Sequence, residues 1–151
     1  MIDLSYPKIL SLIEPYLASK RSESASFLIW YFTNYLRLDS LESIDAVCDQ
    51  SGDKGIDGIY LNAEANVIEV YQSKISQKAV ATVGDKALRE FQGTLSQLET
   101  REAIDNLLAT AGDAQVAKLI ERLDLKNMLL NMTLWDTSYA TVNWIKMVPA
   151  F

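Results

Sequence analysis

Side chains that suit hydrolysis of a phosphodiester lie close together in one stretch of the sequence. Asp57 stands between Gly55 and Gly58, and Gln72 and Lys74 follow it across an apolar run. Mg²⁺ prefers oxygen ligands, usually one or two carboxylates together with waters and substrate phosphate. Asp57 can supply one oxygen, Gln72 a second and the backbone carbonyl of Ser73 a third. Protonated Lys74 can hold an attacking water or face the charge that grows on a phosphate in the transition state. The set therefore suits a nuclease that uses Mg²⁺ or Mn²⁺.

The composition removes most other hydrolytic mechanisms. The chain has 151 residues and no histidine, which excludes Ser-His-Asp and Cys-His catalysis and HExxH zinc sites. Cys48 is the single cysteine, so neither an internal disulfide nor a Cys₄ metal site can form. A small-molecule hydrolase is a further alternative, but the sequence contains no nucleophile signature such as GxSxG.

The charge balance argues against non-specific binding of nucleic acid. The formal net charge is -6, which leaves room only for a local basic cleft. Residues 74–90 carry four positive charges against Asp85 and Glu90, a local balance of +2; the four are Lys74, Lys78, Lys86 and Arg89. If this segment lines the cleft, Lys78, Lys86 and Arg89 supply the phosphate contacts, and we expect weak, salt-sensitive binding.

Nothing in the sequence suggests a membrane. No apolar run approaches the roughly 20 residues of a membrane-spanning helix. The first residues lack the basic and apolar regions of a signal peptide. We therefore expect no membrane partner and a cytoplasmic location.

The hydrophobic pattern predicts an α/β domain. Helical periodicity covers 6–17, 23–38, 85–98 and 100–123, with Gly112 and Asp113 as a dividing point in the last. Strand-like runs cover 44–48, 56–61, 67–75 and 128–135, and the first three form an expected antiparallel meander. Strands bracketed by helices imply one sheet with helices packed on it.

These elements should bring the candidate residues together. Side chains alternate along a strand, so Gln72 and Lys74 share one face of 67–75, and Glu69 faces the other way. A hairpin with a loop at 62–66 can bring Asp57 opposite them. We read Glu69 as solvated or salt-bridged and Asp53 as a turn residue.

The pairing of GIDGIY at 55–60 with QSK at 72–74 resembles the PD-(D/E)XK nuclease superfamily, in its Mrr-like variant with Gln in place of an acidic residue. The stretch 52–74 is most similar to the N-terminal domain of the abortive-infection phage-resistance (AIPR) proteins. The resemblance covers about residues 23–98. It implies a restriction-endonuclease-like core of order α-β-β-β-α-β, with a mixed central sheet and flanking helices.

The resemblance also implies roles for individual residues. Asp57 would be a metal ligand, Gln72 would replace the acidic metal ligand and Lys74 would be the catalytic lysine. A helical Glu often completes such sites, and Glu23 matches best, with Glu14 second. Because Gln72 is neutral, metal binding should be weak until substrate phosphate arrives.

The expected function is a metal-dependent endonuclease domain in anti-phage defence, with DNA favoured over RNA. Residues 1–151 would form one domain with its core at about 23–135, either as an N-terminal fragment of a longer protein or as a minimal relative. Cleavage of both strands of a duplex would favour a homodimer. The alternative is a catalytically inactive domain of the same fold that binds nucleic acid or a protein partner.

Overall fold

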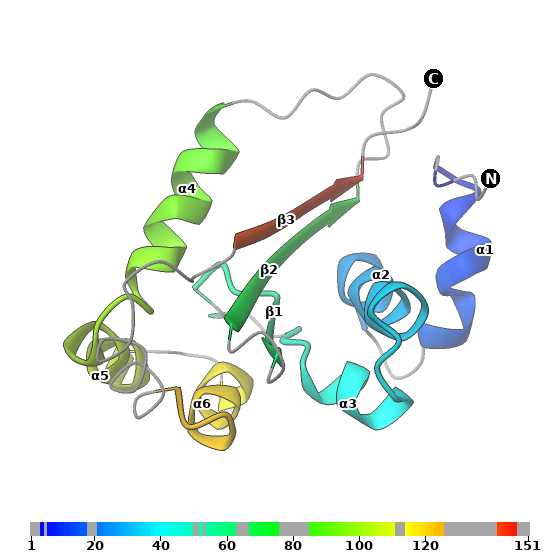
Figure 1. Cartoon of the computed structure of the whole chain (residues 1–151). Coiled ribbons are helices and arrows are strands. Elements are labelled where there is room, and N and C mark those ends of the chain that lie inside the picture. Colours follow the sequence, from blue (N-terminus) through cyan, green and yellow to red (C-terminus); the bar gives the residue numbers. More distant parts are fainter. Residues whose placement is uncertain are drawn as a thin grey trace.

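A computed structural model of the chain describes residue 4 and residues 6–17, 21–49, 52, 54–62, 67–75, 85–110, 114–125 and 142–147. The helices are α1 (Ile9–Ile13), α2 (Glu23–Tyr31), α3 (Ser40–Asp45), α4 (Asp85–Ser96), α5 (Arg101–Thr110) and α6 (Ala114–Arg122). A 3₁₀ turn (Glu14–Tyr16) follows α1 and a π-helical turn (Phe32–Leu36) follows α2. The strands are β1 (Gly58–Asn62), β2 (Val67–Ile75) and β3 (Val142–Met147). The predicted α/β class is confirmed (Figure 1).

The sheet is mixed, with the strand order β1-β2-β3. β1 and β2 form the predicted antiparallel hairpin, in which Gly58 pairs with Tyr71. β3 runs parallel to β2, with Val142 beside Val70. A parallel neighbour needs a long crossover connection, and here the chain passes through α4, α5 and α6 before it returns as β3.

The predicted three-stranded antiparallel meander is wrong. Residues 40–45 form α3 rather than the start of a strand, and only Val47 makes an isolated bridge to Gly58. The helix begins because the Asp39 carboxylate accepts a hydrogen bond from the Glu42 amide at 2.9 Å. The strand predicted at 128–135 lies outside the described residues.

Helix α2 covers one face of the sheet. It begins after Ser22, whose hydroxyl accepts a hydrogen bond from the Ala25 amide at 3.1 Å and so caps the helix. Leu28 and Ile29 are buried and share a core cluster with Tyr71 of β2. On its other side, Phe27 packs with residues of α1. The long apolar run therefore forms a helix buried on several sides, as its composition predicts.

Helices α4, α5 and α6 cover the opposite face. Val70 of β2 shares a second core cluster with Phe91 of α4 and Ile104 of α5, and α6 adds Leu119. Neighbouring residues Val70 and Tyr71 belong to different clusters because successive strand residues point to opposite faces. The sheet thus lies between α2 and the α4–α6 group, the arrangement seen in Figure 1.

No helix in the described part of the chain is long and apolar enough to cross a bilayer.

Candidate functional site

The backbone of Asp57 is fixed from two sides, directly before β1. Its N–H donates to the Tyr71 carbonyl at 3.0 Å, and its own carbonyl accepts from the Cys48 N–H at 2.8 Å. The Asp57 carboxylate accepts a hydrogen bond from the Ser73 N–H at 2.6 Å. The hairpin therefore brings Asp57 beside the part of β2 that carries Gln72 and Lys74.

Two glycines explain why the chain can hold Asp57 in this place. Gly58 lies under α2, where a Cβ would stand 2.9 Å from Leu28 Cδ2 and 3.0 Å from the Ala46 carbonyl oxygen. Gly55 adopts a left-handed φ of 81°, which L-residues with a side chain rarely adopt. The glycine spacing around Asp57 thus meets two separate backbone requirements.

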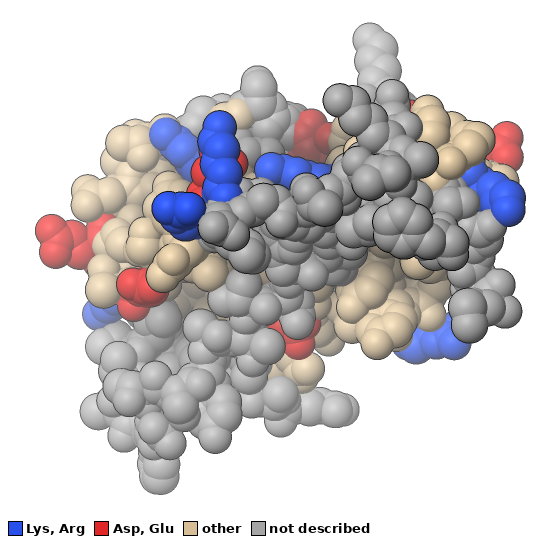
Figure 2. All heavy atoms as spheres, turned by 90° about the horizontal axis from the view of Figure 1, so that it is seen from above, with Lys and Arg blue, Asp and Glu red and all other residues tan. Residues whose placement is uncertain are grey.

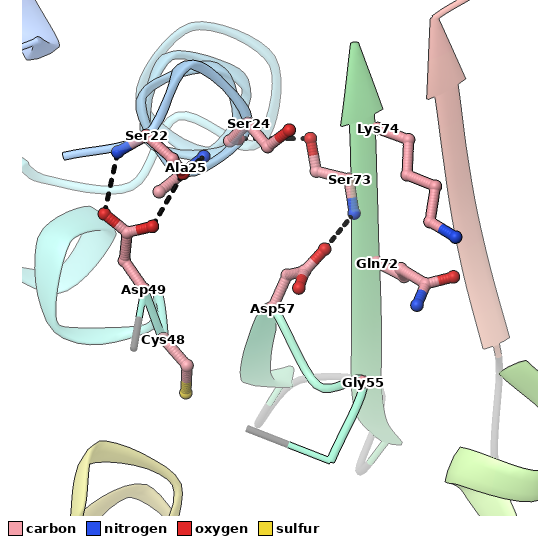
Figure 3. A pocket seen from close by; sticks show the side chains of 10 residues that line it. All are labelled: Ser22, Ser24, Ala25, Cys48, Asp49, Gly55, Asp57, Gln72, Ser73 and Lys74. Atoms are coloured by element: carbon pink, nitrogen blue, oxygen red, sulfur yellow. Dashed lines mark hydrogen bonds between the residues drawn. The ribbon is translucent and has the colours of Figure 1, made fainter. Parts of the chain in front are cut away.

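A pocket of about 410 Å³ opens between α2 and the end of β2. Its lining residues are Ser22, Ser24, Ala25, Cys48, Asp49, Gly55, Asp57, Gln72, Ser73 and Lys74. One water occupies roughly 30 Å³, so the pocket has room for much more than a single ordered solvent molecule. Asp57, Gln72 and Lys74, the three residues predicted to act together, all line it (Figure 3).

Among the described residues, Gln72 has a buried side-chain acceptor without a hydrogen-bond partner. Its side chain is only 9% exposed, and its Oε1 has no hydrogen-bond partner within the described structure. An unpaired buried acceptor costs about 1–3 kcal/mol. Such a group normally has a reason, and a missing ligand or ion is one of the common reasons.

Lys74 and Ser73 leave β2 on opposite sides. Figure 3 shows the Lys74 and Gln72 side chains on one side of β2 and the Asp57 carboxylate on the other, where Ser73 points toward α2. Lys74 is exposed, whereas Ser73 is buried and its hydroxyl donates to the Ser24 carbonyl at 3.1 Å. Because the N–H and C=O of one strand residue point toward the same neighbouring strand, we infer that the Ser73 carbonyl faces the Asp57 side.

Glu23 is not among the residues that line the pocket, although it begins α2. Glu14, the second choice, is exposed in the 3₁₀ turn and does not line it either. The acid that α2 meets at the pocket is Asp49, whose carboxylate accepts from the Ser22 N–H at 2.9 Å and from the Ser22 hydroxyl at 2.6 Å.

The sequence does not single out Asp49, which stands in a stretch rich in acidic residues, 39–57. The Ser22 cap could be read from its position before an apolar helix. Its contact with Asp49, by contrast, joins residues far apart in the chain. Gln115 of α6 also accepts from the Asp49 N–H at 2.8 Å, so Asp49 ties the start of α2 to α6.

Glu69 lies on the opposite face of β2 from Gln72, as alternation predicts. It is half-buried and accepts hydrogen bonds from the Tyr71 hydroxyl and from Asn62 Nδ2, the latter at 3.4 Å. Burial raises the pKa of Tyr31 above its ordinary value, and the nearby Tyr35 and Glu69 raise it further. Glu69 is therefore part of a hydrogen-bonded aromatic cluster and does not line the pocket.

The predicted nucleic-acid contacts are only partly described. Lys86 and Arg89 are exposed on α4, and Lys86 lies 3.6 Å from Glu90. Figure 2 shows several Lys and Arg side chains on the α4 side of the molecule, with Asp and Glu side chains among them. Lys78 and Asp53 lie outside the described residues.

The donor set fits a hard cation with few protein ligands. Asp57 offers a carboxylate and Gln72 an unpartnered amide oxygen, and both line one pocket. In the described ranges, no three Asp, Glu or Cys side chains are grouped so that they could hold a metal ion together. Mg²⁺ often keeps several waters and takes only one or two carboxylates, so this set fits a weakly held ion.

Comparison with known proteins adds no assignment. No family model, no curated protein and no solved structure matches the chain. The resemblance to AIPR and PD-(D/E)XK nucleases therefore stays a prediction from the sequence.

Proposed function

We propose that this chain is a metal-dependent endonuclease domain of the restriction-endonuclease-like fold, related to the N-terminal domain of AIPR proteins and active in anti-phage defence. The observation that carries the proposal is that Asp57, Gln72 and Lys74 all line one pocket, with a buried Gln72 oxygen that has no partner among the described residues.

Each residue has a distinct part in the proposed reaction. The Asp57 carboxylate and Gln72 Oε1 would hold Mg²⁺ or Mn²⁺, with the Ser73 carbonyl as a third oxygen. A bound cation would supply Lewis acidity toward a phosphate oxygen. The exposed ammonium of Lys74 would orient the attacking water or stabilise negative charge on the phosphate in the transition state.

The substrate we favour is DNA, with RNA as the second nucleic acid to test. Lys86 and Arg89 on α4, with Lys78, would contact backbone phosphates, which fixes position without reading sequence. A chain with a net charge of -6 has little bulk attraction for a polyanion. A second copy of the chain would serve a duplex cut on both strands.

The proposal is tested by nicking of supercoiled plasmid in Mg²⁺ or Mn²⁺. We expect Lys74→Ala to lower the cleavage rate by about 10²-fold or more, because it removes the ammonium group that we propose faces the reacting phosphate. Lys118→Ala is the matched control, since Lys118 is an exposed lysine on α6 that does not line the pocket. Equal cleavage by wild type and Lys74→Ala would sink the assignment.

The second candidate is an inactive domain of the same fold that binds nucleic acid or a protein. Two observations favour it: neutral Gln72 stands where an acid is usual, and the described residues contain no cluster of three acidic or cysteine ligands. It predicts that Mn²⁺ leaves the melting temperature unchanged. A Mn²⁺-induced rise that is absent in Asp57→Ala would count against it.

A further inference from the structure

The turn that precedes Asp57 is held in an unusual backbone conformation. Lys54 and Gly55 are both left-handed, with φ of 58° and 81°. The left-handed region is easy for glycine, but it is unfavourable for a residue such as Lys54. Something outside the turn must therefore hold it in place.

Helix α4 supplies the contacts that hold the turn. Thr94 is 6% exposed, and its hydroxyl donates to the Lys54 carbonyl at 3.1 Å. Gln97 Nε2 donates to the same carbonyl at 3.4 Å. The fit is close, since a Cβ on Gly55 would stand only 2.6 Å from Thr94 Oγ1.

The same turn passes beside the Gln72 amide. Gly55 and Gln72 line the same pocket, and a Cβ added to Gly55 would stand 3.6 Å from Gln72 Nε2, so the turn runs close to the amide nitrogen. The amide oxygen at the other corner of the group has no partner in the described structure. The position of the turn therefore sets the space beside Nε2 of an amide whose Oε1 accepts no hydrogen bond within the described structure.

We propose that Thr94 is a positioning residue that fixes the Gln72 amide through the Lys54–Gly55 turn. Its consequence for metal binding rests on the proposed function, but its effect on the amide does not. The path runs from the Thr94 hydroxyl to the Lys54 carbonyl, and through Gly55 to the space beside Gln72 Nε2. Since α4 also carries Lys86 and Arg89, this contact joins the proposed nucleic-acid surface to the pocket.

The test compares Thr94→Val, which removes the hydroxyl at nearly constant size, with Thr94→Ser, which keeps it. The matched control is Thr110→Val on α5. The Thr94 hydroxyl also lies 3.3 Å from the Glu90 carbonyl one turn earlier in α4, and the Thr110 hydroxyl likewise donates to the Asn106 carbonyl one turn earlier at 2.7 Å. The measurement is the side-chain NH₂ signal of Gln72 in NMR spectra of the metal-free protein, with amide hydrogen exchange at Gly55 and Ile56.

We expect Thr94→Val to shift or broaden the Gln72 signal and to speed exchange at Gly55 and Ile56 about fivefold, the effect of one lost hydrogen bond. Thr94→Ser should restore both. An unchanged Gln72 signal in Thr94→Val, or a change equal to that in Thr110→Val, would overturn the proposal. If Thr94→Val does not fold, Gln97→Ala acts on the same carbonyl and should shift the signal less in the same direction; no shift there would overturn it too.

A second arm measures the dissociation constant for Mn²⁺. Residues that orient metal ligands commonly change affinity about tenfold or more, so we expect a tenfold weakening in Thr94→Val and recovery in Thr94→Ser. If wild type binds no Mn²⁺, the proposed function fails and the NMR result still decides the role of Thr94. If wild type binds Mn²⁺ and Thr94→Val binds it equally well, the positioning role is wrong.

Discussion

Tyr71 and Gln72 are neighbours on β2, and both are buried, yet their side-chain polar atoms differ in hydrogen bonding. The Tyr71 hydroxyl donates to Glu69, whose carboxylate also accepts from Asn62. Gln72 Oε1, one residue along, has no partner among the described residues. Tyr71 faces α2 and the stable core, while Gln72 lies in the pocket with Asp57 and Lys74.

The difference suggests that the Tyr71 side chain serves stability, whereas the Gln72 side chain is available for binding. Buried polar groups are normally paired, because an unpaired one lowers the free energy of unfolding. The Tyr71 side of the strand follows that rule. Gln72, the next residue, does not follow that rule. It lies just beyond Tyr71, the last residue toward this end of β2 that pairs with β1.

The largest effect on stability should come from the packed side, at Gly58, which pairs with Tyr71. We expect Gly58→Ala to lower the free energy of unfolding by about 3 kcal/mol, because the new Cβ meets Leu28 and the Ala46 carbonyl. Gly93→Ala is the control, since a Cβ there meets nothing within 4 Å. That helical position should gain about 0.5–1 kcal/mol. Urea unfolding measures both, and equal effects would show that α2 does not pack tightly on this strand.

A smaller loss is expected when the satisfied hydroxyl is removed. Tyr71→Phe keeps the ring but leaves Glu69 without its hydroxyl donor, and we expect a loss of about 1.5 kcal/mol in urea unfolding. Metal affinity should stay as in wild type, because Tyr71 does not line the pocket. A neutral effect on stability would mean that the hydrogen bond to Glu69 adds nothing.

The smallest expected effect is a rise, rather than a fall, in the free energy of unfolding. Gln72→Met replaces the amide by an apolar side chain of similar length, so we expect a gain of about 1 kcal/mol in the free energy of unfolding. On a domain of this size that raises the melting temperature by roughly 3 °C. A loss of stability would show that the amide is satisfied in solution and that the contrast with Tyr71 is false.

The sequence predicted the hairpin, the start of the apolar helix and the placement of Asp57, Gln72 and Lys74 around one pocket. These depend on local signals: strand alternation, a serine before an apolar run and glycines at a turn. The pairing of β2 with β3, the contact of Asp49 with Ser22 and the contact of Thr94 with Lys54 join distant segments. No local pattern encodes them, and a single sequence gives no other signal for them.

The strand predicted at 44–48 failed for a different reason. The acids Asp39, Glu42 and Asp45 recur with helical spacing, and that spacing was the correct guide, because Asp39 caps α3. The apolar residues Ile44 and Val47 suggested a strand, but Ile44 ends up exposed at 37%. Capping chemistry outweighed a short apolar alternation.

The most direct test of the account is the dissociation constant for Mn²⁺ in wild type, Gln72→Met and Gln72→Glu, measured by calorimetry on the intact chain. The account predicts weak binding in wild type, none in Gln72→Met, and binding about tenfold tighter in Gln72→Glu, since a second carboxylate raises the affinity of an oxygen-ligand site. The same dissociation constant in all three proteins, or no binding in any, would contradict it.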